Sequence, residues 1–138
     1  MAETTMVMPA KEAGRVSSGL LYSLRIVIIA HAVSLLVAAS MAGQSVATNH
    51  STIEAHLLVA LVVHILALVQ IVLAVLVWRP GRGAGWPALA SLGLFLVGAA
   101  QHFTWIWLGA HVPNGVALFG LIIAVLVWSW SPGAARRR

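Results

Sequence analysis

Long uncharged apolar runs dominate the pattern of polar and apolar positions along the chain. No residue carries a formal charge between Arg25 and Glu54, from 55 to 78, or from 83 to 135. A helix of about 20 apolar residues crosses the roughly 30 Å hydrocarbon core of a bilayer, and the last run is long enough to cross it twice. The pattern therefore predicts four membrane-spanning helices.

The expected architecture is an all-α bundle with up-down-up-down topology. We expect its helices over residues 18–43, 53–78, 87–109 and 113–130. The break inside the last uncharged run is expected at 109–115, because Pro113 there has no backbone N–H and stands near two flexible glycines. Residues 1–17 are expected to form a weakly ordered arm and residues 132–138 a basic tail.

The composition agrees with a lipid environment, and the distribution of basic residues predicts the orientation of the chain in the membrane. The 138-residue chain is 61% hydrophobic and 8% charged, whereas an ordinary soluble domain is about 25% charged. The eight Lys and Arg residues lie in three places, which are the arm up to Arg25, the 79–86 loop and the 136–138 tail. Four crossings put all three on one side, so the positive-inside rule predicts cytoplasmic termini. We expect a bacterial inner-membrane protein.

Several function classes are excluded or disfavoured by the same composition. The chain has no cysteine, which excludes disulfides, iron–sulfur clusters and thiolate metal sites. It shows no nucleophile motif and no phosphate-binding loop, so an electron carrier or an accessory subunit is expected rather than an enzyme. The basic residues border apolar helices and are explained by orientation and by attraction to anionic lipid, so no nucleic-acid partner is expected.

Polar residues inside the predicted spans are the candidates for function, because polar groups are costly in hydrocarbon. Histidine dominates this set. The histidines in or at the ends of spans are His31, His56, His64, His102 and His111. Other polar residues in or near the spans, candidates to support a bound group by hydrogen bonding, are Glu54, Gln70, Gln101, Thr104 and Asn114.

Helical rise brings histidines that are distant in sequence to similar depths. Counted from the centre of each predicted span, His56 and His111 lie near the outer surface, and His31 and His64 lie near the midplane. Two imidazoles that face each other across a bundle at one depth suit the two axial positions of a haem iron. The sequence therefore predicts a haem b site on either of these pairs.

Three alternatives remain open. A copper or other metal ion could bind His56, His102 and His111 with Glu54 nearby, since imidazole and oxygen ligands suit copper, zinc and iron. An accessory subunit would pack against other membrane subunits without chemistry, with its histidines hydrogen-bonded between helices. A small metal permease or proton path would also use histidines within the membrane.

Part of the sequence resembles one half of a haem A synthase, a minimal cytochrome b and small four-helix bacterial membrane proteins. The resemblance rests on Glu54-Ala55-His56 opening one span, Gln101 in the next, and His111-Val112-Pro113-Asn114-Gly115 opening the last. In haem A synthase halves the histidines that head these two helices ligate haem b. The resemblance thus implies His56 and His111 as ligands. The family places an arginine after the first histidine, and Leu57 stands there in this chain.

Overall fold

The computed structural model describes residues 14–47 and 52–137. In these ranges the chain forms α1 (Ser18–Ala47), α2 (Ile53–Trp78), α3 (Trp86–Thr104) and α4 (Leu108–Ser129), followed by a short 3-10 helix, η1 (Pro132–Ala135). Each α-helix is long and apolar enough to cross a membrane. The predicted all-α, four-helix architecture of a multi-pass membrane protein is confirmed.

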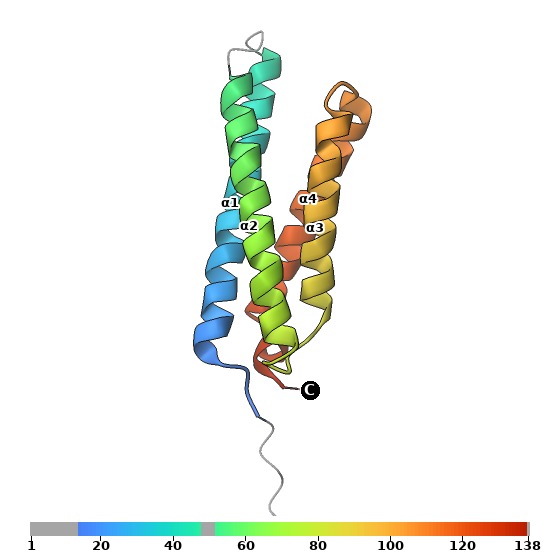
Figure 1. Ribbon diagram of the computed structural model, residues 1–138. Coiled ribbons are helices and arrows are strands. Elements are labelled where there is room, and N and C mark those ends of the chain that lie inside the picture. The colour runs from blue at the N-terminus through green and yellow to red at the C-terminus, as the bar shows by residue number, and fades with distance from the viewer. Residues whose placement is uncertain (1–13, 48–51, 138) are drawn as a thin grey trace, which may run out of the picture.

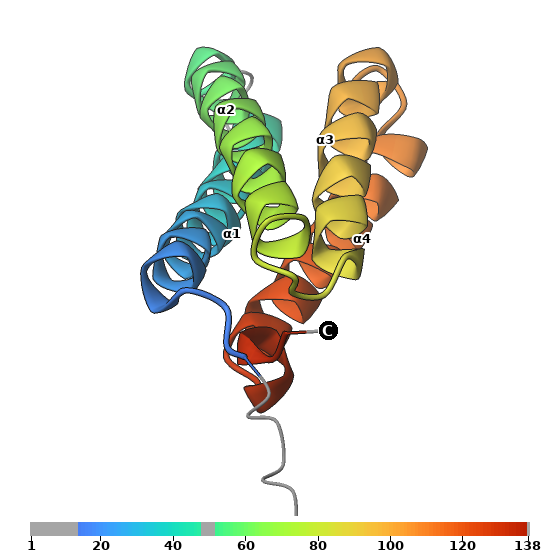
Figure 2. The same cartoon turned by 60° about the horizontal axis from the view of Figure 1, so that its bottom comes forward.

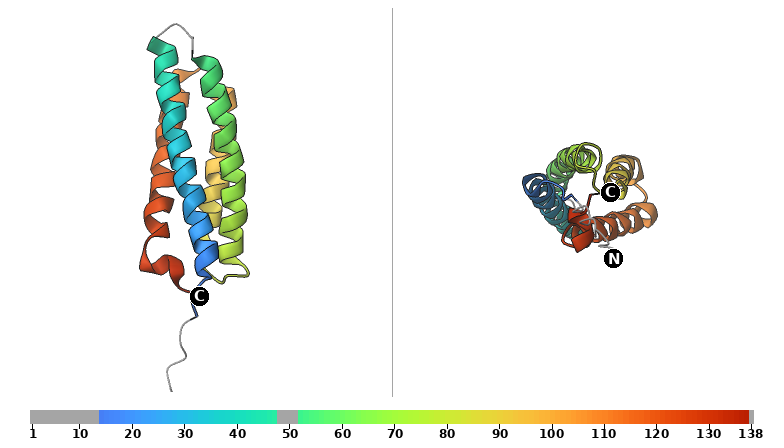
Figure 3. Two further views of the ribbon diagram at one scale, coloured as in Figure 1. Left: turned by 90° about the vertical axis from the view of Figure 1, so that its left-hand side faces the viewer. Right: turned by 90° about the horizontal axis from the view of Figure 1, so that it is seen from below.

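The four helices form a ring in chain order. Each packs against its neighbour in sequence, and α1 also packs against α4. Figure 1 shows the alternating up-down course of the chain, and the view from below in Figure 3 shows the ring. Helices α2 and α4 therefore run in the same direction and lie diagonally opposite each other.

The tightly packed core lies toward the end of the bundle that carries the chain termini, which we call the terminal end. Leu24, Ile28, Val77, Ile122 and Val125 meet there, and all are at most 1% exposed. At the opposite end, which we call the distal end, the α1–α2 and α3–α4 hairpins stand farther apart (Figures 1 and 2).

A chain of hydrogen bonds links three helices inside the bundle. His31 Nδ1–H donates to Gln70 Oε1 over 2.9 Å, and Gln70 Nε2 donates to Ser91 Oγ over 2.9 Å. Ser91 Oγ in turn donates to the Pro87 carbonyl over 2.7 Å. Gln70 and Ser91 are fully buried and His31 is almost so, and their bonds satisfy groups that would be costly to leave unpaired in an apolar interior.

The two ends of the described chain are joined by backbone hydrogen bonds. Val16 N–H donates to the Ala135 carbonyl, and Arg137 N–H donates to the Gly14 carbonyl, each over 3.0 Å. Val16 is buried in the core below this contact. Of the arm predicted over 1–17, residues 1–13 lie outside the described ranges, whereas residues 14–16 pair with the C-terminal segment.

The helix bounds differ from the prediction by more than one residue at two places, both at the distal end. The α3–α4 turn lies at 105–107 rather than 109–115, so Pro113 lies inside α4, near its start. Pro113 is the sixth residue of α4, beyond the first turn, so α4 lacks the hydrogen bond that an N–H at this position would donate to the carbonyl of residue 109. Helix α1 continues past 43 to Ala47, and the Ser45 and Thr52 hydroxyls, 2.7 Å apart, tie this extra turn to the start of α2.

Candidate functional site

A cavity of about 510 Å³ occupies the distal end of the bundle between the two hairpins. All four helices line it, α1 with the last part of its length and α4 with its first three turns. Its wall is mainly apolar, and its polar members are His56, His64, Gln101 and His111. Pockets that take cofactor-sized ligands are typically about 300–1,000 Å³ with apolar walls and few polar groups, which is the character of this cavity.

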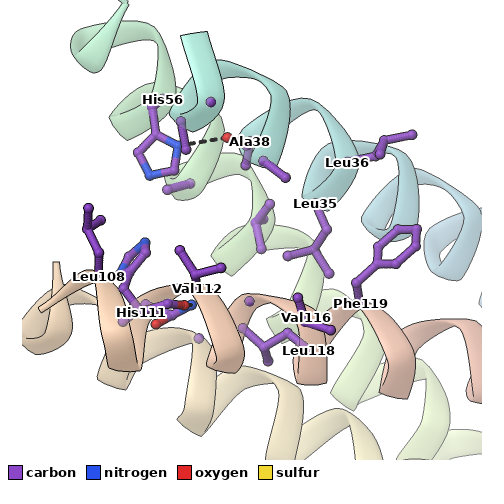
Figure 4. Close-up of a pocket in the computed structure, with 18 of the residues that line it drawn as sticks. Leu35, Leu36, Ala38, His56, Leu108, His111, Val112, Val116, Leu118 and Phe119 are labelled. Atoms are coloured by element: carbon purple, nitrogen blue, oxygen red, sulfur yellow. Dashed lines mark hydrogen bonds between the residues drawn. The ribbon is translucent and has the colours of Figure 1, made fainter. Parts of the chain in front are cut away.

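His56 and His111 face each other across this cavity. They come from the first turns of the diagonal helices α2 and α4, and their ring centres are 6.4 Å apart with the ring planes at 61°. Figure 4 shows the two imidazoles on opposite sides of the space. If one metal were bonded to one nitrogen of each ring at about 2 Å, with the two rings on opposite sides of the metal, the ring centres would be roughly 6 Å apart. His56 and His111 could therefore hold one metal between them through one ring nitrogen each.

A contact with α1 sets which nitrogen of the His56 ring carries the hydrogen. Its Nδ1 lies 2.9 Å from the carbonyl oxygen of Ala38 (dashed line in Figure 4). A carbonyl oxygen only accepts, so Nδ1 carries the proton and the neutral ring has its lone pair at Nε2. Histidines that bind metals commonly donate their other N–H to a carbonyl in this way.

The start of α4, which carries His111, is held by the end of α3. Gln101 Nε2 donates to the His111 carbonyl over 3.0 Å, and the Thr104 hydroxyl donates to Gln101 Oε1 over 3.0 Å. Thr104 Oγ1 is also 3.5 Å from His111 Nδ1, a weak contact. The structure thus places Gln101 against the backbone of His111 and Thr104 beside its ring.

His64 lies on the cavity wall beside a different partner. Its Nδ1–H donates to the Ala60 carbonyl one turn earlier in α2 over 2.7 Å, and its Nε2 is buried without a hydrogen-bond partner among the described residues. Its ring centre lies 5.0 Å from that of His102 on α3. His102 is exposed and does not line the cavity.

The second predicted haem pair, His31 with His64, is not brought together as a facing pair. His31 lies outside the cavity lining and is hydrogen-bonded to Gln70, so Gln70 acts as a structural partner of His31. His64 is engaged with Ala60 and His102. Of the two pairs, only His56 and His111 share the cavity and face each other across it.

The predicted metal site on His56, His102 and His111 is also not assembled. In residues 14–47 and 52–137, no three His, Asp or Glu side chains lie close enough to hold one metal ion. His102 lies instead against His64, on the outer face of the bundle. Glu54 is exposed in the first turn of α2 and Asn114 is half-buried on α4, and neither lines the cavity.

Sequence reasoning missed the partners that shape this site. The Ala38 carbonyl, which orients His56, is a backbone group that every residue has, so the residue types in the sequence do not reveal this contact. The room for a ligand comes from small residues such as Ala42, Ala60, Gly98 and Gly115. Ala60, Ala67 and Ala74 recur along one side of α2, which signals a close helix approach in the sequence but does not distinguish a packed seam from a cavity.

Comparisons of the chain with models of protein families, with curated proteins and with solved structures found no match. The case for a function therefore rests on the geometry of the cavity and its histidines.

Proposed function

We propose that this protein is a cytochrome b-like membrane electron carrier that binds haem b through His56 and His111. The observation that carries the proposal is the facing pair of imidazoles, 6.4 Å apart, within an apolar cavity. Haem iron with two histidine ligands cycles between ferrous and ferric states and so passes single electrons. The donor proposed here is a quinol, and the acceptor is another membrane protein.

The residues present fit the iron and the flat apolar ring of a haem. His56 presents a lone pair at Nε2, because its other nitrogen donates to Ala38. Side chains such as Leu35, Val112 and Phe119 contribute to the apolar wall of the cavity. Burial of this kind and hydrogen bonding to the ligand rings are the means by which a protein sets a haem potential.

The carboxylate groups of a haem have no basic partner in the described part of the distal end. The described Lys and Arg positions are Arg15, Arg25, Arg79, Arg82, Arg136 and Arg137, and all belong to the arm, the α2–α3 loop, the terminal end of α1 or the tail. The proposal therefore assigns haem binding to the histidine pair and the apolar wall. A cation from a partner protein would add to it.

Orientation and location belong to the same proposal. The terminal end gathers the basic residues, and the positive-inside rule places such an end in the cytoplasm. We therefore place both termini in the cytoplasm of a bacterial cell, with the protein in the inner membrane. In this orientation the proposed haem site lies toward the outer side of the membrane.

A spectrum of the purified protein tests the haem proposal. The full chain, produced with a supply of haem and purified in detergent, should show a sharp α band and a shifted Soret band in the reduced-minus-oxidised difference. His56→Ala and His111→Ala should each lose this six-coordinate spectrum. His102→Ala is the matched control, because it removes a distal imidazole outside the cavity, and it should keep the spectrum.

Two outcomes would contradict the proposal. Haem-supplied wild-type protein without any haem spectrum would leave an accessory subunit, packed on other membrane proteins, as the better explanation. A copper or zinc content near one per chain, lost on His102→Ala, would favour the metal-site alternative. Helix content and elution volume of each variant show whether the variant has folded.

A further inference from the structure

A second cavity, of about 450 Å³, lies at the terminal end of the bundle, far from the histidine pair. It lies where the first turns of α1 meet the C-terminal segment. Its lining residues include two arginines, a serine and a tyrosine together with apolar residues. The lining residues that matter here are Arg15, Val16, Ser18, Leu21, Tyr22 and Arg25.

The Arg25 side chain is held in place by contacts at the end of α4 and with Tyr22 of its own helix. Its Nε–H donates to the Ser129 carbonyl over 2.9 Å. Its guanidinium carbon lies 4.4 Å from the ring centre of Trp130 and 5.0 Å from that of Tyr22. An arginine has five N–H donors, and this arrangement fixes the group through one of them, so its four Nη hydrogens have no hydrogen-bond partner among residues 14–47 and 52–137.

The Arg15 backbone is fixed at the same cavity by the contact between the chain ends. Arg15 pairs with Arg136 in an antiparallel bridge, and the hydrogen bonds on either side of it run from Val16 to Ala135 and from Arg137 to Gly14. This contact brings a second cation to the mouth of the cavity, from a part of the chain before α1. Two arginines from separate segments thus converge on one space.

These cations lack an anionic partner in the described ranges. The one described carboxylate side chain is that of Glu54, which lies at the distal end in the first turn of α2. Paired guanidinium groups recognise phosphate through short, charge-assisted hydrogen bonds. The cavity therefore has the chemistry of a site for a phosphate group.

The position of the cavity favours a phospholipid as the source of the phosphate. It lies at the start of α1, where a membrane-spanning helix enters the bilayer. Next to it, the lipid-facing side of α1 exposes Tyr22 by 54% and Ile26 by 66%. A phosphate group bound by the arginines would leave acyl chains free to lie along these side chains.

We propose that the Arg15–Arg25 cavity binds the phosphate group of an anionic phospholipid. The bound phosphate would neutralise both guanidinium groups and anchor the terminal end at the membrane surface. It shares no residue with the histidine pair, so its test is independent of whether the protein carries haem.

The test measures the thermal unfolding midpoint of the full chain in a neutral detergent. Phosphatidylglycerol should raise the midpoint, and phosphatidylcholine should not. Because each arginine near a membrane surface adds an appreciable attraction, Arg15→Gln should weaken the apparent affinity for phosphatidylglycerol roughly fivefold. Arg25→Lys keeps the charge but loses the planar fork, and it should also bind more weakly.

The matched control is the double variant Arg79→Gln, Arg82→Gln, which removes two cations from the same end but outside the cavity. It should bind phosphatidylglycerol as the wild type does. Equal weakening in this control would overturn the proposal in favour of diffuse charge attraction. An equal midpoint shift with inorganic phosphate alone would keep the phosphate site but overturn the lipid as its source.

Discussion

The imidazole of His31 and the side-chain amide of Gln70 join α1 to α2 through a buried hydrogen bond of 2.9 Å. Ser91 extends this bond to α3, so one amide bridges three helices. Gln70 uses both ends of its amide group, the oxygen as acceptor and the nitrogen as donor. A residue of this kind fixes which faces of the three helices meet.

Gln70→Leu should therefore destabilise the protein, because it leaves the His31 N–H unpaired in an apolar interior. We expect a loss of about 1–2 kcal/mol in the free energy of unfolding, within the range found for hydrogen bonds between membrane helices. Reversible unfolding in mixed micelles measures it. Ser40→Ala is the control, since Ser40 is exposed and its side chain donates to the Leu36 carbonyl of its own helix. A Gln70→Leu variant as stable as this control would refute the bridging role.

His64→Leu should behave differently from Gln70→Leu. The Nε2 of His64 is buried without a partner in the described residues, and replacing an unsatisfied buried polar group by an apolar one of similar size costs little. We expect a free energy of unfolding within about 1 kcal/mol of the wild type, measured in the same micelles. A larger loss would show that the contacts of His64 with Ala60 and His102 stabilise the bundle.

Filling the cavity should abolish haem binding without unfolding the bundle. A side chain at Gly98 would extend toward the cavity, where its Cβ would lie 3.6 Å from His64 Nε2, an ordinary contact. Gly98→Ala should therefore keep the haem spectrum, and Gly98→Leu should lose most of it. Gly120→Leu adds the same volume where nothing lies within 4 Å, and its spectrum should be unchanged.

The proposed orientation is open to cysteine labelling, because the chain has no native cysteine. Ile106→Cys lies in the exposed α3–α4 turn at the distal end. It should react in intact cells with a maleimide that does not cross membranes. Ser131→Cys, beyond α4 at the terminal end, should react only after the membrane is opened. The reverse result would place the termini outside the cytoplasm.

The four-helix architecture was predictable because charge is confined to a few places in the sequence. An uncharged run of more than 20 residues leaves few alternatives to a spanning helix. The α3–α4 turn was misplaced because its residues, Trp105, Ile106 and Trp107, are as apolar as the helices beside it. Pro113 is the more visible signal, yet it lies inside α4.

The direction in which side chains lean explains why one histidine pair meets and the other does not. Side chains on a helix tilt toward its N-terminus. Helices α2 and α4 run the same way, so His56 and His111 tilt together and stay level. Helices α1 and α2 are antiparallel, so His31 and His64 tilt apart. His31 instead tilts toward Gln70, six residues farther along α2 than His64.

The contact between Gly14–Val16 and Ala135–Arg137 makes the described chain almost a closed circle. A short linker across this contact, with new ends opened in the 79–85 loop, would give a circularly permuted protein in which the order of helices becomes α3, α4, α1, α2. Such a permutant would keep every neighbouring pair of the ring and both new ends at the same side of the bilayer. The order in which the hairpins enter the membrane is thus separable from the bundle that they form.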